Sequence, residues 1–212
     1  MNQKSEIDLL LIVTRKIDYE VSEVNGRVIK VVDTPGVCDT TSDKQAADKL
    51  VMDALERAIA TNPKGYHAML LVVKYGGRFT GEEQAGIKYL KTLFGENFVK
   101  DYGILIVTGG DTYEFDNQRH GIPFEKWCRQ QIGAFKELYE ECDRRAVLFN
   151  NISADKSIKS NQVRQLITVV DQLKSRGKRY TNQAFERARE SRAKVFVRVK
   201  YPFWLKMKQF GN

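Results

Sequence analysis

The 212-residue sequence predicts an α/β fold built on a three-layer, mostly parallel sheet. Two near-continuous apolar runs, at 67–73 and 102–107, are typical of strands that are covered on both faces. Segments with apolar residues at three- and four-residue spacing separate the predicted strands, which favours helices packed on the sheet. With 42% hydrophobic and 29% charged residues, the chain can build one core, and its length fits one domain plus an extension.

The first predicted strands form a hairpin. Residues 17–24 alternate apolar and polar side chains with a period of two, and residues 27–32 follow directly after Asn25-Gly26. Asn-Gly between two such runs is a strong hairpin signal. We expect this hairpin at one edge of the sheet, as its antiparallel element. The spacing of apolar residues then predicts a helix over 43–60.

A buried strand over 67–73 and a capped helix come next. Thr80 and Glu83 have the spacing of a capping box, and the helix that they begin ends at Gly95. Further elements are predicted downstream: a strand over 102–107, a loop to about Pro123, one helix over 124–142, a strand over 146–149 and a helix over 162–173. Residues 1–180 would then form the domain and 181–212 a basic, partly helical, amphipathic tail.

The positive charge of the chain is concentrated near its C-terminus. The formal net charge is +8, yet Lys174–Asn212 alone contains 12 basic and 2 acidic residues. A basic tail favours an acidic partner such as a membrane surface or nucleic acid. We expect an anionic membrane surface and no specific nucleic acid, with a solvated or disordered tail as the alternative.

Other features of the composition favour a cytoplasmic protein. No apolar run approaches the roughly 20 residues that span a bilayer, and the N-terminus lacks the pattern of a signal peptide. Cys38, Cys128 and Cys142 are odd in number and widely spaced, which indicates reduced thiols. We therefore expect a cytoplasmic location, with peripheral membrane attachment through the tail.

Three predicted strands end in polar residues, at 33–36, 108–111 and 150–151. Open α/β sheets bind ligands at the carboxyl ends of their strands. At the first end, Asp33 could hold magnesium through a water, and Gly36 would let a backbone N–H approach a terminal phosphate. The alternative is a strand followed by an ordinary proline turn.

The segment Thr108-Gly109-Gly110-Asp111 has the chemistry of a base-binding loop. A carboxylate only accepts hydrogen bonds, so Asp111 could receive the N–H groups of a guanine edge. The two glycines would let the base lie against the backbone. An ordinary strand-to-helix turn is the alternative here, and a turn that caps a strand is the alternative for Asn150-Asn151.

Several longer motifs point to one family. They are Val-Val-Asp-Thr-Pro-Gly-Val-Cys-Asp-Thr at 31–40, His-Ala-Met-Leu-Leu-Val-Val at 67–73, Gly-Arg-Phe-Thr-Gly-Glu-Glu at 77–83, Leu-Phe-Gly-Glu at 93–96, Thr-Gly-Gly-Asp at 108–111 and Phe-Asn-Asn at 149–151. From about Val13 to about Ala184 the sequence resembles the GIMAP/IAN family, the immunity-associated nucleotide-binding GTPases related to septins. The resemblance implies a G domain that binds GTP or GDP with Mg²⁺, assembles with itself or with family members, and often reaches membranes through a C-terminal segment.

Matched by position, this resemblance also implies functional residues. Thr14 and Asp33 would be the magnesium residues. The implied nucleotide contacts are Asp33, Thr34, Gly36, Thr108, Gly109, Gly110, Asp111 and Asn151. Val37-Cys38-Asp39 come directly after Gly36, with no glutamine there to orient an attacking water, so we assign no catalytic residue and expect weak hydrolysis or none.

The sequence departs from the family at the phosphate loop. The family begins with a central strand and Gly-x-x-x-x-Gly-Lys-Ser, whose backbone N–H groups cradle phosphates. No such string occurs in these 212 residues, and Gly177-Lys178 lies at the wrong end of the domain. We therefore expect an N-terminally truncated G domain without its first strand and phosphate loop, unless Ile7–Val13 fills part of that place.

Two functions remain open at this point. The chain could be a guanine-nucleotide-binding protein with weak hydrolysis or none. It could instead be a non-catalytic interaction module that pairs with intact relatives, and either function is compatible with a membrane-bound tail. Nucleotide binding by the isolated chain discriminates between the two.

Overall fold

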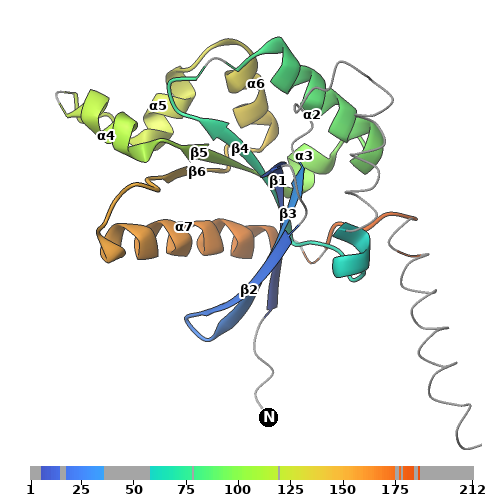
Figure 1. The fold of residues 1–212 in the computed structure, drawn as a ribbon. Coiled ribbons are helices and arrows are strands. Elements are labelled where there is room, and N and C mark those ends of the chain that lie inside the picture. The colour runs from blue at the N-terminus through green and yellow to red at the C-terminus, as the bar shows by residue number, and fades with distance from the viewer. Residues whose placement is uncertain are drawn as a thin grey trace, which may run out of the picture.

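The computed structural model describes residues 6–14, 18–35, 58–77, 79–118, 120–174, 177, 179–183 and 186. Within them, one sheet has the strand order β2-β3-β1-β4-β5-β6 (Figure 1). The strands are β1 (Glu6–Thr14), β2 (Asp18–Val24), β3 (Arg27–Pro35), β4 (Ala68–Lys74), β5 (Gly103–Thr108) and β6 (Ala146–Phe149). The helices are α2 (Gly81–Phe94), α3 (Phe98–Tyr102), α4 (Gly110–Asn117), α5 (Phe124–Gln130), α6 (Gly133–Glu141) and α7 (Lys156–Lys174).

Strand β1 occupies the centre of the sheet. It pairs in parallel with β3 on one side and with β4 on the other, so that Leu9 stands opposite both Val31 and Ala68. Ile7, Leu9 and Leu10 are buried, as strands covered on both faces require. The expectation of a missing central strand is therefore wrong, because the residues around Ile7–Val13 fill that place.

The strand pairing confirms a mostly parallel sheet with one antiparallel edge strand. β4 pairs in parallel with β5, and β5 with β6. β2 and β3 pair antiparallel around Asn25 and Gly26, whose φ angles of 51° and 75° suit a tight two-residue hairpin turn. This hairpin lies at one edge of the sheet, as the sequence predicts.

Helices cover both faces of the sheet, which gives three layers (Figure 1). On the face of α2, α3, α5 and α6, the core includes Leu105 and Val107 of β5 together with Leu138 of α6. On the opposite face, Ile104 and Ile106 pack with residues of α7 such as Val170. The alternation of β5 side chains between the two cores is the two-residue period of a strand.

Several helices differ from the sequence prediction. Residues 110–117, expected within a loop, form α4. The single helix expected over 124–142 is two helices, because Ile132 is extended and Gly133 has a φ of 63°. The last helix begins at Lys156, several residues before the predicted start. The predicted helix 43–60 lies outside the described residues except for 58–60, which are helical.

Two further findings concern membranes and thiols. No helix among the described residues is long and apolar enough to cross a bilayer. Cys128 and Cys142 are free and buried, and burial raises the pKa of each thiol to about 12. Neither is therefore a reactive thiolate at neutral pH.

Candidate functional site

The polar residues predicted as a site lie along the carboxyl edge of the sheet. Asp33 is near the end of β3, opposite Leu11 of β1, and Thr108 ends β5 opposite Phe149 of β6. Strands β1 and β4 separate β3 from β5. Through Leu11 and Leu70, the register places Asp33 level with Ile104, four residues before Thr108. At the usual strand spacing and rise per residue, Asp33 and Thr108 are therefore roughly 20 Å apart. The arrangement suits an elongated ligand that lies across several strand ends.

The loops that follow β5 and β6 touch through Gly110. A Cβ atom placed on Gly110 would lie 2.9 Å from the backbone nitrogen of Asn150 and 3.0 Å from the carbonyl carbon of Phe149. Such distances are shorter than a carbon atom tolerates, so only glycine fits without a shift of the backbone. Gly110 thus joins the two loops that the sequence predicts to bind a base.

Asp111 is placed in the first turn of α4, directly after that contact. Its side chain is half-buried, and Thr112 Oγ1 donates a hydrogen bond to Asp111 Oδ2 at 3.4 Å. Gly109, the residue before the helix, has a φ of 82°, and this left-handed conformation turns the chain from the strand into the helix. The carboxylate therefore lies at the helix start, partly accessible to an incoming N–H donor.

The two asparagines after β6 have different surroundings. Asn150 is buried: its side-chain amide donates to Glu114 Oε2 at 3.1 Å, and its Oδ1 accepts from Ser153 N at 2.9 Å. Asn151 is exposed. Sequence reasoning singled out Asn151 and missed the structural role of Asn150, because both follow the strand and burial alone distinguishes them.

An aromatic cluster supports the loop after β5. Tyr75 donates its backbone N–H to the carbonyl of Thr108 at 2.8 Å, and its Cβ would lie 3.4 Å from a Cβ placed on Gly109. Its ring packs against Tyr113 and Trp127, with centroids 5.5 Å and 5.0 Å away. Sequence reasoning missed Tyr75, although its position directly after a buried strand was a usable signal.

The phosphate side of the candidate site is less complete. The end of β1 at Thr14 lies opposite Pro35, close to half-buried Asp33, so the backbone brings the two predicted magnesium residues to neighbouring strand ends. The side chains of Thr14 and Thr34, and all of Gly36, are outside the described residues.

These residues fit magnesium and phosphate only in part. Carboxylate and hydroxyl oxygens are suitable Mg²⁺ ligands, but the described part of the chain contains no cluster of three acidic, histidine or cysteine side chains that could hold a metal. Only Arg15-Lys16-Ile17 joins β1 to β2, where a G domain has its phosphate loop, and this link has no glycine. The arrangement is therefore more complete for a base than for phosphates.

Comparison with known proteins shows the family of this chain. A model of the AIG1 family matches residues 5–199. Immune-associated nucleotide-binding protein 9 of Arabidopsis thaliana is 34% identical over 177 residues, which cover 82% of this chain and 49% of that protein. Immune-associated nucleotide-binding protein 3 of the same plant is 31% identical over 189 residues, 89% of this chain and 52% of that protein. The chain thus spans about half the length of these relatives.

A solved structure shares the fold. Toc33 from Arabidopsis thaliana, crystallised in complex with Mg²⁺ and GMPPNP, aligns with a TM-score of 0.51 at 13% sequence identity. The alignment covers 80% of this chain and 86% of Toc33. At this identity the similarity shows a common fold alone and does not transfer a ligand.

Proposed function

This chain belongs to the AIG1 family of nucleotide-binding proteins, and we propose that it is a guanine-nucleotide-binding domain that recognises mainly the base. The contact of Gly110 with the backbone at Asn150 carries this proposal, because it joins two loops at the carboxyl ends of neighbouring strands. Asp111 follows at once, with a carboxylate that accepts the N–H groups of guanine. Exposed Asn151 lies on the second loop.

Affinity for the phosphates is expected to be low. Each charge-assisted hydrogen bond is worth about 1.5–3 kcal/mol. Without the backbone N–H groups and lysine of a phosphate loop, even three lost contacts weaken binding by roughly a thousand-fold to a million-fold. Asp33, Thr34, Gly36 and Thr14 would orient GTP or GDP with Mg²⁺ but hold it weakly, so hydrolysis is weak or absent.

Calorimetry on the 212-residue chain tests this proposal with GTP, GDP and ATP in the presence of magnesium. We expect weak binding of GTP and GDP with similar affinities, weaker binding of ATP, and loss of the guanine preference in Asp111→Asn. Equal binding of ATP and GTP would contradict base recognition. A micromolar dissociation constant for GTP that Asp33→Ala abolishes would show that another segment replaces the phosphate loop.

The second candidate function is a non-catalytic interaction module that pairs with intact relatives. The absence of Gly-x-x-x-x-Gly-Lys from this chain favours it, and the net charge of +10 in Lys174–Asn212 favours an anionic membrane surface as its location in the cytoplasm. Co-sedimentation with anionic liposomes, with and without residues 195–212, tests membrane attachment. Equal sedimentation of both forms would reject it.

A further inference from the structure

Helix α4 contacts the loop after β6 at two of its positions. Gly110 and Glu114 are four residues apart, so they lie on the same face of the helix. Gly110 leaves no room for a Cβ atom beside the backbone nitrogen of Asn150. Glu114 Oε2 accepts a hydrogen bond from the side-chain amide of the same asparagine at 3.1 Å. One face of α4 is thus fixed to this loop through both the backbone and the side chain of Asn150.

Tyr113 fixes another side of α4 to the aromatic cluster. Its buried ring has its centroid 5.7 Å from that of Phe124 and 6.1 Å from that of Trp127, both in α5. Its hydroxyl donates a hydrogen bond to the carbonyl of Ile122. These contacts hold α4 in place without Glu114, so the bond from Glu114 to Asn150 mainly determines where the loop after β6 lies.

The side-chain amide of Asn150 is fixed in one orientation. Asn150 is only 5% exposed, and its Oδ1 accepts the backbone N–H of Ser153 at 2.9 Å, which directs Nδ2 toward Glu114. A carboxylate only accepts hydrogen bonds, so Glu114 suits the amide N–H in this orientation. Glu114 itself is exposed. An exposed carboxylate therefore holds a buried amide, at the junction of the two candidate base loops.

Recognition of guanine needs an acceptor and a donor at a fixed separation. Guanine has an acceptor at O6 and a donor in its 2-amino group, whereas adenine has a donor at position 6. Asp111 on α4 provides an acceptor, and the amide of Asn151 on the loop can provide a donor. These residues directly follow Gly110 and Asn150 in the chain. The contact between α4 and the loop therefore sets the separation of the two recognition groups.

We infer that Glu114 is a positioning residue for guanine recognition, an inference that rests on the proposed function. Through Asn150, it holds the loop after β6 at the distance from Asp111 that suits the guanine edge. A displacement of about 0.5 Å is enough to impair a hydrogen-bonded site. Adenine does not match this pair of groups, so its binding depends less on their separation. Glu114 thus affects the choice of base more than the affinity for phosphates.

NMR titrations of the 212-residue chain with GDP and with ADP, both with magnesium, test this inference. We expect Glu114→Ala to reduce the preference for GDP, the ratio of the two dissociation constants, at least about fivefold. Glu137→Ala, which changes an exposed glutamate on α6, is the matched control and should preserve the ratio. A loss of stability alone weakens both nucleotides in proportion, so it leaves the ratio unchanged.

Two further variants test whether Glu114 acts through Asn150. Glu114→Gln should preserve the preference within about twofold, because its amide oxygen still accepts from Asn150. Asn150→Asp removes the donor and should reduce the preference as Glu114→Ala does. In Asn150→Asp/Glu114→Gln the glutamine amide can donate to the aspartate carboxylate, so the preference should return. Circular dichroism verifies that each variant is folded.

The outcomes separate this inference from the proposed function. Equal binding of GDP and ADP by the wild type would overturn the proposed base recognition, and the role of Glu114 with it. A preference for GDP in the wild type that survives in Glu114→Ala would overturn this inference alone. A loss in Glu114→Gln as large as in Glu114→Ala would also overturn it, since the charge of Glu114 would then act without Asn150.

Discussion

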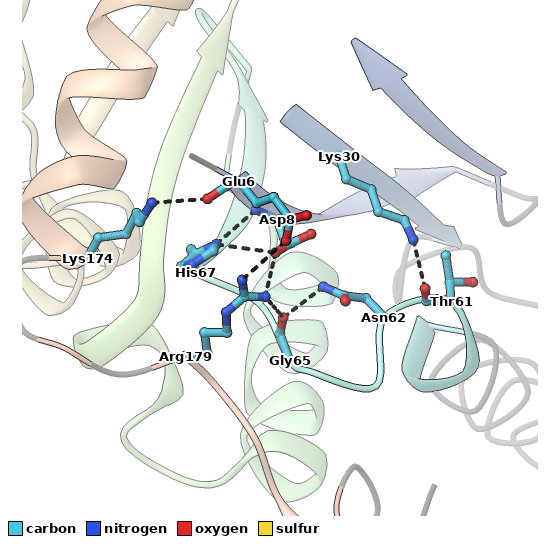
Figure 2. Close-up of polar contacts among 9 residues, drawn as sticks. All are labelled: Glu6, Asp8, Lys30, Thr61, Asn62, Gly65, His67, Lys174 and Arg179. Atoms are coloured by element: carbon cyan, nitrogen blue, oxygen red, sulfur yellow. Dashed lines mark hydrogen bonds and ion pairs between the residues drawn. The ribbon is translucent and has the colours of Figure 1, made fainter. Parts of the chain in front are cut away.

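Arg179 and Asp8 form an ion pair across 171 residues of sequence, with 2.5 Å between Nη1 and Oδ2. The Asp8 side chain is only 8% exposed. Next to this pair, Tyr66 and Tyr180 exchange backbone hydrogen bonds of 3.2 Å and 2.7 Å. Arg179 also donates to the carbonyl of Gly65 (Figure 2). The segment after α7 thus closes the end of the sheet opposite the candidate site.

Removal of Arg179 should destabilise the domain. In Arg179→Leu the buried Asp8 carboxylate loses its guanidinium partner, and we expect the free energy of unfolding to fall by about 3 kcal/mol. Urea unfolding followed by circular dichroism measures this change. Arg129→Leu is the matched control, because its ion pair with Glu125 is exposed and should contribute less than about 1 kcal/mol. Similar losses in both variants would contradict a special role for Arg179.

Gly65→Ala should be more destabilising than a substitution at an open glycine. Gly65 has a φ of +84°, and a Cβ there would lie 2.1 Å from the carbonyl oxygen of Tyr180. Gly76 has a similar φ of +71° but nothing within 4 Å. We expect Gly76→Ala to cost about 1–2 kcal/mol from backbone strain alone, and Gly65→Ala clearly more. Thermal unfolding of both variants measures this difference in stability. Equal melting temperatures would contradict the predicted clash at Gly65.

Stability should fall in mild acid because of His67. Burial, followed by the positive charges of Arg179 and Lys174, lowers the pKa of His67 to about 4 from an ordinary value of 6.5. Between these values the unfolded chain binds the proton and the folded chain does not, so the free energy of unfolding decreases as the pH drops. The loss amounts to at most about 3 kcal/mol.

Two asparagine variants separate this effect from general acid sensitivity. His67 Nδ1 accepts the backbone N–H of Asp8 at 2.9 Å, and an asparagine at position 67 also offers an acceptor. We expect His67→Asn to remove the part of the pH dependence between pH 4 and 6.5. His120→Asn, which changes an exposed histidine, should preserve it. An unchanged slope in His67→Asn would assign the acid sensitivity to other groups.

The two asparagines after β6 should separate stability from binding. Asn150→Ala removes the bonds to Glu114 and Ser153, so we expect a loss of about 1–3 kcal/mol in the free energy of unfolding. Exposed Asn151 should tolerate alanine without loss of stability, yet Asn151→Ala should weaken guanine-nucleotide binding. Denaturation and calorimetry on both variants measure these effects. Unaltered binding in Asn151→Ala would remove this residue from the proposed site.

Local sequence patterns predicted the elements that depend on neighbouring residues. The capping box forms, with Glu83 Oε2 accepting from the Thr80 backbone at 2.7 Å. The hairpin at Asn25-Gly26 and the buried strand at 103–107 also follow from short-range signals. By contrast, residues 110–117 contain acidic and turn-forming residues that do not favour a helix locally, and α4 forms there with Gly110 and Tyr113 buried.

Contacts between distant residues could not be predicted in this way. Nothing local connects Asp8 with Arg179, or Gly110 with the backbone at Asn150, and both contacts arise from the strand order. The motif at 67–73 predicts a buried strand and supports the family resemblance, but it gives no role for His67. In the structure, His67 and Asp8 belong to the closed end of the sheet, far along the strands from the candidate nucleotide loops.

The pairing of Asp8 with Arg179 also bears on how the chain folds as it leaves the ribosome. Synthesis at roughly 5–20 residues per second separates the emergence of these two residues by about 10–35 s. During that interval β1 can already pair with β3 and β4, but its buried carboxylate has no guanidinium beside it. The nascent domain therefore has a buried carboxylate without its guanidinium partner until Arg179 has emerged, so the closed end of the sheet is completed only after β1 has had time to pair with β3 and β4.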